Sequence, residues 1–168
     1  MQGLIKVILN LFSRKFLIKI SLILKPFFEL IFRGDRFVDP INNKSYSYFF
    51  PYGYNKLRKN ALSPGTLSLE RHRLLWIFLE KETDFFNTEN KILHIAPEQC
   101  FYKSFKKNFK SYTSCDLNSP IAEIRADVCN LPFDENEFDF VLCNHVLEQV
   151  YDDEKAMKEK FRVLKHKG

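Results

Sequence analysis

Glycine, cysteine and tryptophan are scarce in this 168-residue sequence. It contains five Gly, four Cys and one Trp, whereas a collagen-like chain needs glycine at every third position and a disulfide scaffold needs far more cysteine. Hydrophobic residues make up 45% and charged residues 28% of the chain, which excludes a disordered chain. The composition is that of a packed soluble domain, and the length allows one such domain with an appendage.

The cysteines lie too far apart for a local metal or redox motif. Successive cysteines are 15, 14 and 14 positions apart, at Cys100, Cys115, Cys129 and Cys143. Without a Cys-x-x-Cys pair, neither a zinc knuckle nor a thioredoxin-like site is supported. We therefore expect no bound metal and four thiols that fill buried space. Free thiols without a secretory leader are typical of a reducing compartment, so a cytoplasmic location is predicted.

Residues 3–32 are strongly apolar but contain no long uninterrupted hydrophobic run. Every stretch is broken by a charged residue or a proline, namely Lys6, Arg14, Lys15, Lys19, Lys25 or Pro26. A membrane-spanning helix needs about 20 predominantly apolar residues, and a signal peptide needs an unbroken apolar centre and a cleavage site of small residues. Neither is present. Residues 1–33 are instead predicted to form a basic amphipathic helix.

Two kinds of partner are compatible with this helix. Apolar bulk with snorkelling lysines is how an interfacial helix lies on an anionic bilayer, which would place the protein at the inner membrane face. The same amphipathicity would let the helix cover the body of the protein or a partner subunit. Both interpretations stay open at this point.

The excess of positive charge is confined to the N-terminal segment. Residues 1–36 carry a net charge of +5, and the other 132 residues carry 19 basic and 19 acidic side chains. Aromatic residues near Lys56, Arg58 and Lys59 could form a base-stacking platform. A nucleic-acid-binding body, however, is expected to have its own basic patch. No nucleic-acid partner is predicted.

Residues 34–66 are rich in Tyr, Phe, Asn, Ser, Pro and Gly and have no helical period. Short aromatic stretches, separated by turn sequences at residues 42–43 and 63–65, predict a small β element. A helix is predicted after Ser68, a candidate N-cap. Its expected apolar stripe consists of Leu74, Leu75, Phe78 and Leu79. His72 is expected at the surface or in packing, because no second metal ligand stands at a useful spacing.

The last hundred residues alternate strand and helix patterns. Strands are predicted at residues 91–96, 112–116, 121–126 and 138–143. One helix, at residues 98–109, should bury Phe101, Phe105 and Phe109; another, capped by Asp152, should bury Met157, Phe161 and Leu164. This order indicates an α/β fold with a Rossmann-like, mostly parallel sheet of four strands. The predicted parts are a helical segment (1–33), a small β element (34–66) and an incomplete α/β domain (67–168).

Side chains able to bind a ligand follow the predicted strands. They are Ala96 to Glu98 after the first strand, Asp116 after the second, Asp127 with Val128 after the third, and Asn144 with His145 after the fourth. Ligands of parallel sheets bind at the carboxyl ends of the strands, so these residues should share one site. An acid after the second strand can accept from both hydroxyls of a ribose, and an Asp after the third can accept from the adenine amine. An adenosine-containing ligand is predicted.

Residues 126–168 resemble class I S-adenosylmethionine-dependent methyltransferases of the methyltransferase type 11 kind. The resemblance rests on the stretches Ala-Asp-Val-Cys-Asn-Leu-Pro-Phe, Phe-Asp-Phe-Val, Asn-His-Val-Leu-Glu and Arg-Val-Leu-Lys-His-Lys-Gly, which occur in the family's order. It implies S-adenosylmethionine as the cofactor. It implies that Asp116, followed by Leu117, binds the ribose, that Asp127 and Val128 recognise adenine, and that Asn144 and His145 face the methyl group and acceptor. A turn cap is the alternative role for Asp127.

The loop after the first strand departs from the usual glycine-rich family pattern. It reads His94-Ile-Ala-Pro-Glu98-Gln-Cys100, and a subfamily with a His-x-Ala-Pro-Glu loop is similar to it. This resemblance implies that His94, Ala96 and Glu98 line the cofactor site and that Glu98 faces the ammonium group of the cofactor. The alternative is that Glu98 is present because an acid is favourable at a helix N-terminus.

Proteins related to this subfamily hold a zinc ribbon built from two Cys-Pro-x-Cys pairs. At the equivalent positions this sequence has Asp39-Pro-Ile-Asn42 and Ser63-Pro-Gly-Thr66. Zinc needs about four nitrogen or sulfur ligands, and no thiolate is present. The resemblance therefore implies a ribbon-like element without metal.

Two hypotheses about function follow from the resemblance. The first is methyl transfer from S-adenosylmethionine to a small-molecule or membrane-proximal acceptor, with His145 as the base if the acceptor must lose a proton; capping of its own loop is the alternative role for His145. The sequence ends at Gly168, where the family continues into further strands, so a C-terminally truncated chain is implied. The second hypothesis is a non-catalytic remnant of the fold, held at a membrane or partner through residues 1–33.

Overall fold

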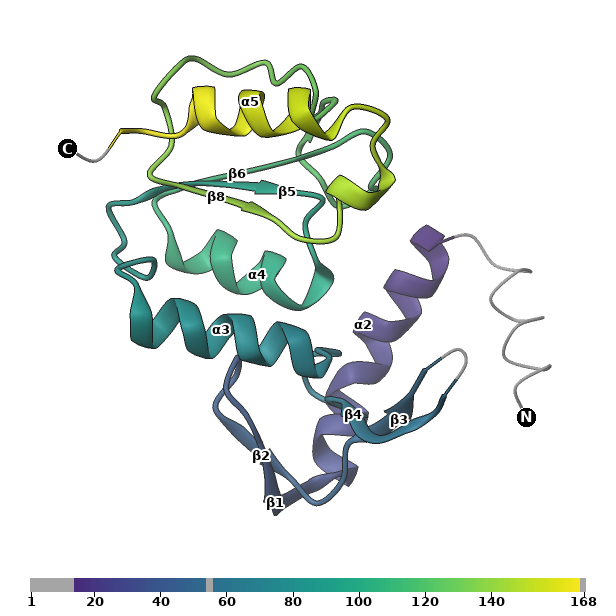
Figure 1. Ribbon diagram of the computed structural model, residues 1–168. Coiled ribbons are helices and arrows are strands. Elements are labelled where there is room, and N and C mark those ends of the chain that lie inside the picture. The colour runs from purple at the N-terminus through teal and green to yellow at the C-terminus, as the bar shows by residue number, and fades with distance from the viewer. Residues whose placement is uncertain (1–13, 54–55, 167–168) are drawn as a thin grey trace. The chain divides into compact units, whose positions relative to one another are not determined.

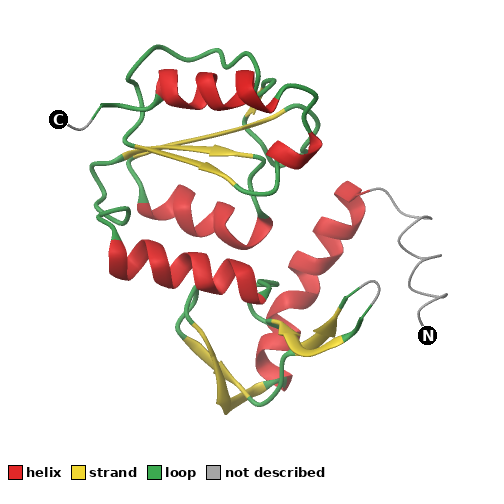
Figure 2. Cartoon of the chain, in the orientation of Figure 1, coloured by secondary structure: helices red, strands yellow, loops and turns green. Residues whose placement is uncertain are grey.

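The computed structural model describes residues 14–53 and 56–166. The chain divides into two compact units, Met1–Leu74 and Leu75–Gly168. The first unit combines a helix with two small β-hairpins, and the second contains a parallel sheet with helices on both faces (Figures 1 and 2). The part of the predicted N-terminal helix at residues 1–13 lies outside the described residues.

The first unit begins with helix α2 (Arg14–Ile31). Two antiparallel hairpins follow: β1 (Arg33–Asp39) pairs with β2 (Lys44–Tyr46), and β3 (Phe50–Tyr52) pairs with β4 (Arg58–Leu62). The predicted turns at residues 42–43 and 63–65 are confirmed, and Asn43 takes the left-handed conformation, with φ of 53°. Asparagine tolerates that conformation better than most residues because its short side chain can hydrogen-bond locally.

Aromatic pairs fasten α2 to the hairpins. The ring centroid of Phe50 lies 5.3 Å from that of Phe28 and 4.9 Å from that of Phe32, both in edge-to-face geometry. Phe32 also lies 6.4 Å from Tyr48. Each such pair adds about 0.5–1.5 kcal/mol beyond the area that it buries. The predicted clustering of aromatic residues in the β element therefore has a packing explanation.

A buried carboxylate joins the turns of the two hairpins. Asp39 is fully buried and accepts hydrogen bonds from the backbone N–H of Ile41 at 3.0 Å and from the hydroxyls of Thr66 at 2.5 Å and Ser68 at 3.3 Å. The guanidinium of Arg73 donates to the Ser68 carbonyl at 2.7 Å. Hydrogen bonds to charged groups are the stronger ones, so this cluster links segments that are far apart in the sequence.

The four positions equivalent to zinc ligands hold hydrogen-bonding side chains. Asp39 and Thr66 are bonded to each other, Asn42 donates to the Tyr46 hydroxyl at 2.9 Å, and the Ser63 hydroxyl accepts from the backbone N–H of Gly65 at 3.2 Å. Within residues 14–53 and 56–166, no three His, Cys, Asp or Glu side chains group as a metal site would require. The absence of metal stays a prediction.

We expect Asp39→Ala to lower the free energy of unfolding by about 3 kcal/mol, because several buried donors would lose their shared acceptor. Urea denaturation followed by circular dichroism would measure the change. Asp35→Ala, at an exposed position of the same strand, is the matched control and should shift stability by less than about 0.5 kcal/mol. Equal effects of the two substitutions would contradict this role for Asp39.

The second unit is built on a four-stranded parallel sheet of order β7-β6-β5-β8. The strands are β5 (Lys91–Ile95), β6 (Ser111–Asp116), β7 (Ile124–Arg125) and β8 (Phe140–Cys143). Helix α4 (Gln99–Asn108) covers one face of the sheet, and α5 (Asp153–Val163) covers the other (Figure 1). A 3₁₀ turn at Leu147–Gln149 precedes α5. The predicted Rossmann-like α/β fold is confirmed.

Two predicted strands are shorter than expected by two residues or more. The third covers Ile124–Arg125 rather than residues 121–126, because Asp116 accepts from the amides of Asn118 and Ser119 and folds the chain into a turn before pairing resumes. The fourth begins at Phe140 rather than residue 138. Phe138 instead forms an isolated parallel bridge with Leu164.

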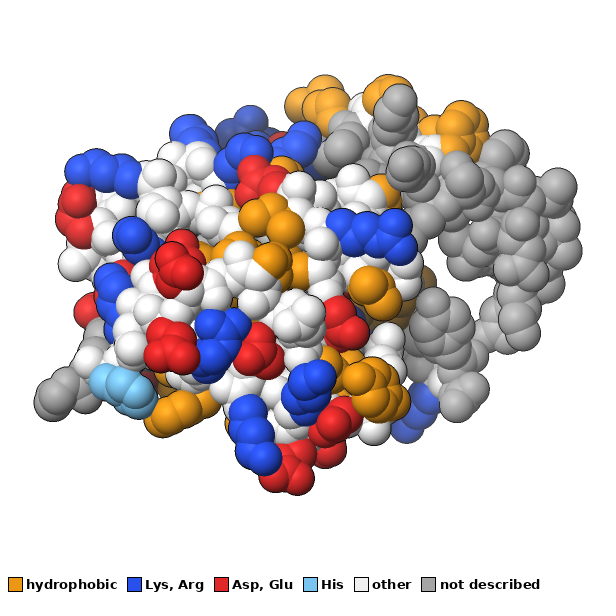
Figure 3. All heavy atoms as spheres, turned by 90° about the horizontal axis from the view of Figure 1, so that it is seen from above, with side chains coloured by type: hydrophobic (Ala, Val, Ile, Leu, Met, Phe, Trp, Pro, Cys, Tyr) orange, Lys and Arg blue, Asp and Glu red, His pale blue; other side chains and the backbone are white. Residues whose placement is uncertain are grey.

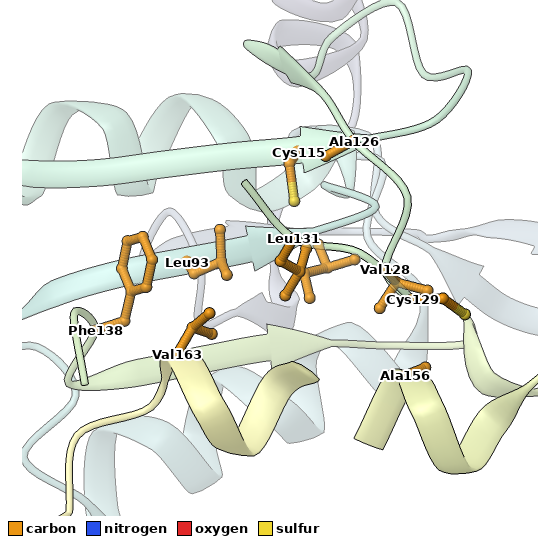
Figure 4. Packing of buried hydrophobic residues seen from close by; sticks show 10 residues of the cluster. Leu93, Cys115, Ala126, Val128, Cys129, Leu131, Phe138, Ala156 and Val163 are labelled. Atoms are coloured by element: carbon orange, nitrogen blue, oxygen red, sulfur yellow. The ribbon is translucent and has the colours of Figure 1, made fainter. Parts of the chain in front are cut away.

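Aromatic side chains fill the space beneath the sheet. Phe101 and Phe105 are fully buried and Phe109 is nearly so, which confirms the predicted stripe of α4. Phe105 stacks on Trp76 of α3 (Glu70–Glu82), with centroids 5.8 Å apart. On the other face the core consists mainly of smaller side chains together with Phe138 (Figure 4); the smaller ones include Leu93, Cys115, Val128, Leu131, Ala156 and Val163.

The expected apolar face of α3 is wrong by about one residue. Leu79 is buried, but Leu74 and Phe78 are 69% and 52% exposed, and the other buried positions are His72 and Trp76. Ser68 does not cap the helix either. Its hydroxyl bonds to Asp39, and at the helix start the ring Nδ1 of His72 accepts from the backbone N–H of Leu69 at 3.1 Å. His72 is therefore a buried structural residue, not a surface one.

The expected apolar face of α5 is also wrong, although its cap is confirmed. Asp152 accepts from the backbone N–H of Lys155 at 2.9 Å. Met157 and Phe161 are 52% and 63% exposed, whereas Ala156 and Val163 are buried. The small side chain of Ala156 allows the helix to approach the sheet closely.

Charged residues set the orientation of α5. Arg162 donates to the carbonyls of Leu131 at 2.9 Å and Phe133 at 2.8 Å, while Glu159 accepts from the Leu131 backbone N–H at 2.8 Å. These bonds hold that side of the helix against the loop before β8. Hydrophobic periodicity alone could not reveal them.

In the described part of the chain, none of the helices has both the length and the hydropathy needed to cross a lipid bilayer.

Candidate functional site

The carboxyl ends of three neighbouring strands meet at one edge of the sheet. Ile95 pairs with Cys115 on one side and with Cys143 on the other. The next residues along the chain, Ala96, Asp116 and Asn144, therefore lie at the same level of three adjacent strands. The strand order reverses between β5 and β8. Helix α4, which follows β5, covers one face of the sheet, and α5, which follows β8, covers the other (Figure 1). Open α/β sheets bind ligands at this switch point.

Three predicted site residues are joined by hydrogen bonds at that edge. Nε2 of His94 lies 2.6 Å from Oε2 of Glu98, and the side-chain amide of Asn144 donates to Oε1 of Glu98 at 3.0 Å. On its other side, Nδ1 of His94 lies 3.0 Å from the Tyr112 hydroxyl. His94 is fully buried, and the Glu98 side chain is 17% exposed. These four residues are called the Glu98 cluster below.

The surroundings of the Glu98 cluster determine which of its atoms donate the hydrogen bonds. Burial raises the pKa of Tyr112, with the nearby Tyr102, Glu123 and Glu98 adding to the effect, so the phenol keeps its proton. A phenol that donates to Nδ1 of His94 leaves the ring proton on Nε2. Nε2 then donates to the carboxylate of Glu98, which can only accept. Both oxygens of Glu98 are thus held by donors from different strands.

Glu98 occupies the N-cap position of α4, but its side chain makes no capping hydrogen bond. Its carboxylate is instead bonded to His94 and Asn144. An acid that was present only to favour the helix N-terminus would need neither partner. The arrangement produces a fixed, partly exposed negative charge at the end of β5, where a cation can approach.

Ala96 has a left-handed backbone conformation, with φ of 52°. Its backbone N–H donates to the Cys115 carbonyl at 2.9 Å, which fixes the loop to β6. The left-handed region costs about 1–2 kcal/mol for a residue with a Cβ atom. Glycine would avoid that cost, so this loop shape is held at an energetic cost.

Asp116 ends β6 with one carboxylate oxygen committed to the backbone. Oδ1 accepts from the backbone N–H of Asn118 at 2.7 Å and also from the backbone N–H of Ser119. These bonds fix the orientation of the carboxylate and leave Oδ2 without a hydrogen bond to any described residue. Leu117, the next residue, is 48% exposed beside it. The geometry suits an acceptor for a pair of ligand hydroxyls.

Asp127 and Val128 follow β7 in a tight turn. Oδ1 of Asp127 accepts from the Cys129 backbone N–H at 2.9 Å, so the turn cap expected from the alternative interpretation is present. The Val128 side chain is buried in the core (Figure 4), which leaves only its backbone for a ligand. Their part in adenine recognition stays a prediction.

His145 is exposed and is not hydrogen-bonded to the Glu98 cluster in the described residues. Its Nδ1 lies 3.2 Å from Oε1 of Glu148, and its carbonyl accepts from the side chain of Gln149 at 3.2 Å. The backbone is left-handed, with φ of 55°; such strain is concentrated at functional sites. The structure shows the loop-holding contacts, and a role as catalytic base stays a prediction.

Tyr112 is the site residue that the sequence analysis missed. The sequence pattern places it only in the second strand. A signal was available, because His94 pairs with Ser114 in the sheet and side chains two residues apart in a strand share one face. Tyr112 therefore stands diagonally across from His94. The long phenol side chain can reach a ring nitrogen that a shorter residue could not.

Cys115 lies in β6 directly before Asp116 of the site. Burial raises the pKa of the Cys115 thiol to about 12, with the charge of Asp116 as a second cause. Cys115 should therefore stay a thiol at pH 8, because ionisation begins only near its folded-state pKa.

Iodoacetamide at pH 8 should modify Cys115 only after unfolding, whereas the half-buried Cys100 should react first. Mass spectrometry of tryptic peptides would show the order in which the two thiols are modified. Equal labelling of both in the folded protein would contradict the prediction.

The surface above α5 carries both signs of charge. On the face seen in Figure 3, Lys and Arg side chains are interspersed with Asp and Glu. Ion pairs such as Lys158 with Glu154, at 2.7 Å, neutralise neighbouring charges. This face has no uniform basic patch of the kind that binds a phosphate backbone.

Comparisons with known proteins gave a family match and similar solved structures. Residues 89–168 match the family described as Methyltransferase domain. Comparison with curated proteins gave no match. The YcgJ protein from Bacillus subtilis is 22% identical in sequence, with a TM-score of 0.49 over 59% of this chain and 48% of its own. A SAM-dependent methyltransferase from Thermotoga maritima is 25% identical, with a TM-score of 0.39 over 48% of this chain and 42% of its own.

The chain thus spans less than half the length of both solved structures. The family match covers the whole parallel sheet, both helices that flank it and every predicted site residue. Residues 89–168, a little under half of the chain, are thus similar to the methyltransferase domain family.

Proposed function

We propose that this chain binds S-adenosylmethionine at the carboxyl edge of its sheet and serves methyl transfer to a small-molecule or membrane-proximal acceptor. The observation that carries the proposal is the Glu98 cluster: a carboxylate fixed by two donors at the switch point of a methyltransferase sheet. The groups that the cofactor presents are an ammonium, a ribose diol and an adenine. The edge offers acceptors for the first two, in Glu98 and Asp116.

Glu98 supplies the charge for the ammonium group. Its carboxylate is 17% exposed, so a cation that reaches it is partly removed from water, and a charge pair is stronger there than at the surface. His94 and Asn144 hold the carboxylate in place before the ligand arrives. Preorganisation of this kind lowers the entropic cost of binding.

Asp116 supplies the acceptor for the ribose. It ends β6, the strand next to β5, at the level of Ala96. Glu98 follows β5, so the two acids come after neighbouring strands at one edge of the sheet. The two amide donors on Oδ1 keep the carboxylate oriented. Oδ2 is then available to the ribose hydroxyls. Asp127 and the backbone of Val128 follow the next strand and are proposed to recognise the adenine edge.

The chemistry needs little from the protein beyond alignment. S-adenosylmethionine supplies a methyl group on a sulfonium; the acceptor's lone pair forms the new bond to carbon in line, and the sulfur keeps the electrons of the broken bond. The residues of the edge hold the donor and exclude water. His145 is proposed to take the acceptor's proton at its ring nitrogen where the acceptor has one to lose.

Calorimetric titration of the full chain with S-adenosylhomocysteine tests the proposal. Saturable binding is expected, and Asp116→Ala should weaken it about tenfold or more, because hydrogen bonds to a charged group are lost. Asp153→Ala, at an exposed position in the first turn of α5, is the control and should leave the affinity unchanged. A folded chain that does not bind would overturn the proposal and support the non-catalytic alternative.

A further inference from the structure

One face of α2 exposes a continuous row of apolar side chains. The row follows helical spacing of three and four residues, so its members lie on one side of the helix. They are Ile20, Ile23, Phe27 and Leu30, which are 37%, 72%, 59% and 73% exposed. The helix is fastened to the hairpins through different residues, Phe28 and Phe32. This set of four residues is called the apolar stripe below.

A cavity of about 560 Å³ adjoins the apolar stripe. It lies between the second half of α2, the start of β1 and the turn into β2, all within the first unit. Leu30 belongs both to the stripe and to the lining of the cavity, so the two are continuous. The polar lining includes Arg33, Lys44 and Ser45.

Positive charge dominates around this cavity. Its carboxylate, Glu29, is already held by two lysines, with Nζ of Lys44 at 2.6 Å and Nζ of Lys25 at 3.7 Å. Arg33 is exposed and makes no ion pair with any described residue. The cavity lining thus contains two cations, Arg33 and Lys44, and one acid, Glu29. A guanidinium with free donors beside an ammonium and a hydroxyl suits a phosphate oxygen.

We propose that the apolar stripe and the cavity together bind an anionic phospholipid of a membrane surface. The phosphate of the headgroup lies in the cavity against Arg33 and Lys44, and the stripe enters the acyl region beside it. The charge of the chain is complementary to such a surface, because the whole net charge of +5 lies within residues 1–36. Buried apolar area and attraction to anionic lipid are the two terms that bind interfacial helices.

This inference is independent of the proposed cofactor site, which lies in the other unit. It selects one of the two partners that the sequence left open for the N-terminal segment. A second copy of the chain or a protein partner would use the stripe but would have no need for a cation-lined cavity at its end.

Flotation of the full chain with lipid vesicles tests the proposal. Vesicles of phosphatidylcholine mixed with phosphatidylglycerol should carry the protein, and vesicles of phosphatidylcholine alone should not. Raising the salt concentration should weaken binding, because exposed charges are screened. Failure of the folded chain to bind the mixed vesicles would overturn the proposal.

Matched variants separate the two parts of the site. Arg33→Gln should weaken binding about fivefold, the effect of one basic residue at an anionic surface, and Arg71→Gln, at another exposed arginine, should have no effect. Ile23→Ser combined with Leu30→Ser should weaken binding at least about tenfold, from the loss of buried apolar area. The control is Leu74→Ser combined with Phe78→Ser, two residues of similar exposure on α3.

Two other results would contradict the proposal. Equal losses from Arg33→Gln and Arg71→Gln would show general charge attraction without a headgroup site. Saturable, Arg33-dependent binding of soluble glycerol phosphate, together with no binding to vesicles, would show a site for a free phosphate compound instead of a lipid.

Discussion

Glu98→Gln should remove the preference of this chain for ligands that carry the amino-acid part of the cofactor. The wild-type chain should bind S-adenosylhomocysteine more tightly than methylthioadenosine, which has the same nucleoside but no ammonium group. Glutamine keeps the size of the side chain but loses the charge, and its amide would face the donor of Asn144. We expect the affinity for S-adenosylhomocysteine to fall about 10- to 100-fold, with little change for methylthioadenosine.

Calorimetric titration with both ligands measures this difference. Glu154→Gln is the control. This exposed acid forms an ion pair with Lys158 at 2.7 Å on α5, and its substitution should leave both affinities unchanged. Equal loss of affinity for both ligands after Glu98→Gln would indicate a disturbed loop. Unchanged preference would show that the ammonium group is bound elsewhere.

Phe105→Ala should cost the second unit much of its stability. Phe105 is fully buried and packs against Trp76, Phe85, Phe101 and Phe109, with ring centroids between 5.2 and 5.8 Å away. Removing a buried phenylalanine typically costs about 3–5 kcal/mol, from lost burial and the cavity left behind. A small domain has a total stability of about 5–15 kcal/mol, so the effect is a large fraction of the whole.

The fluorescence of Trp76, the sole tryptophan of the sequence, provides the probe, because its ring stacks on Phe105. Urea denaturation should show a large fall in the midpoint for Phe105→Ala. Phe161→Ala, at a position that is 63% exposed, should change stability by less than about 0.5 kcal/mol. If the two substitutions had the same effect, the aromatic layer would not be the core of this unit.

The sheet could be predicted because its signals are local. The apolar stretches at β5, β6 and β8 and the acids that follow them placed the strands and their carboxyl ends within a few residues. The helices were also predictable, and α4 buries the expected Phe101 and Phe105. The sequence predicts too long a third strand. The backbone hydrogen bonds to Asp116 that form a turn before it depend on backbone geometry, which a residue pattern does not record.

The buried faces of α3 and α5 could not be predicted from hydrophobicity. In each helix a polar contact competes with the apolar pattern: His72 bonds at the start of α3, and Arg162 and Glu159 bind a loop beside α5. In both helices large apolar residues, such as Phe78 and Phe161, remain exposed. Tertiary hydrogen bonds of this kind have no periodicity.

The site was predictable in its residues but not in its connections. The sequence placed His94, Glu98 and Asn144 at strand ends, and the structure joins them by hydrogen bonds. Tyr112 was missed because its contact depends on the register of β5 against β6. His145, proposed as the base, lies beside Glu148, whereas the neighbouring Asn144 donates a hydrogen bond to Glu98.

A crystal structure of the chain with S-adenosylhomocysteine tests the central claim most directly. The account predicts the ligand at the carboxyl edge of the sheet, with its ammonium nitrogen at hydrogen-bond distance, about 2.7–3.2 Å, from the carboxylate of Glu98. The ribose hydroxyls should lie at a similar distance from Asp116. A ligand bound at another place, or bound here with its ammonium group turned away from Glu98, would contradict the account.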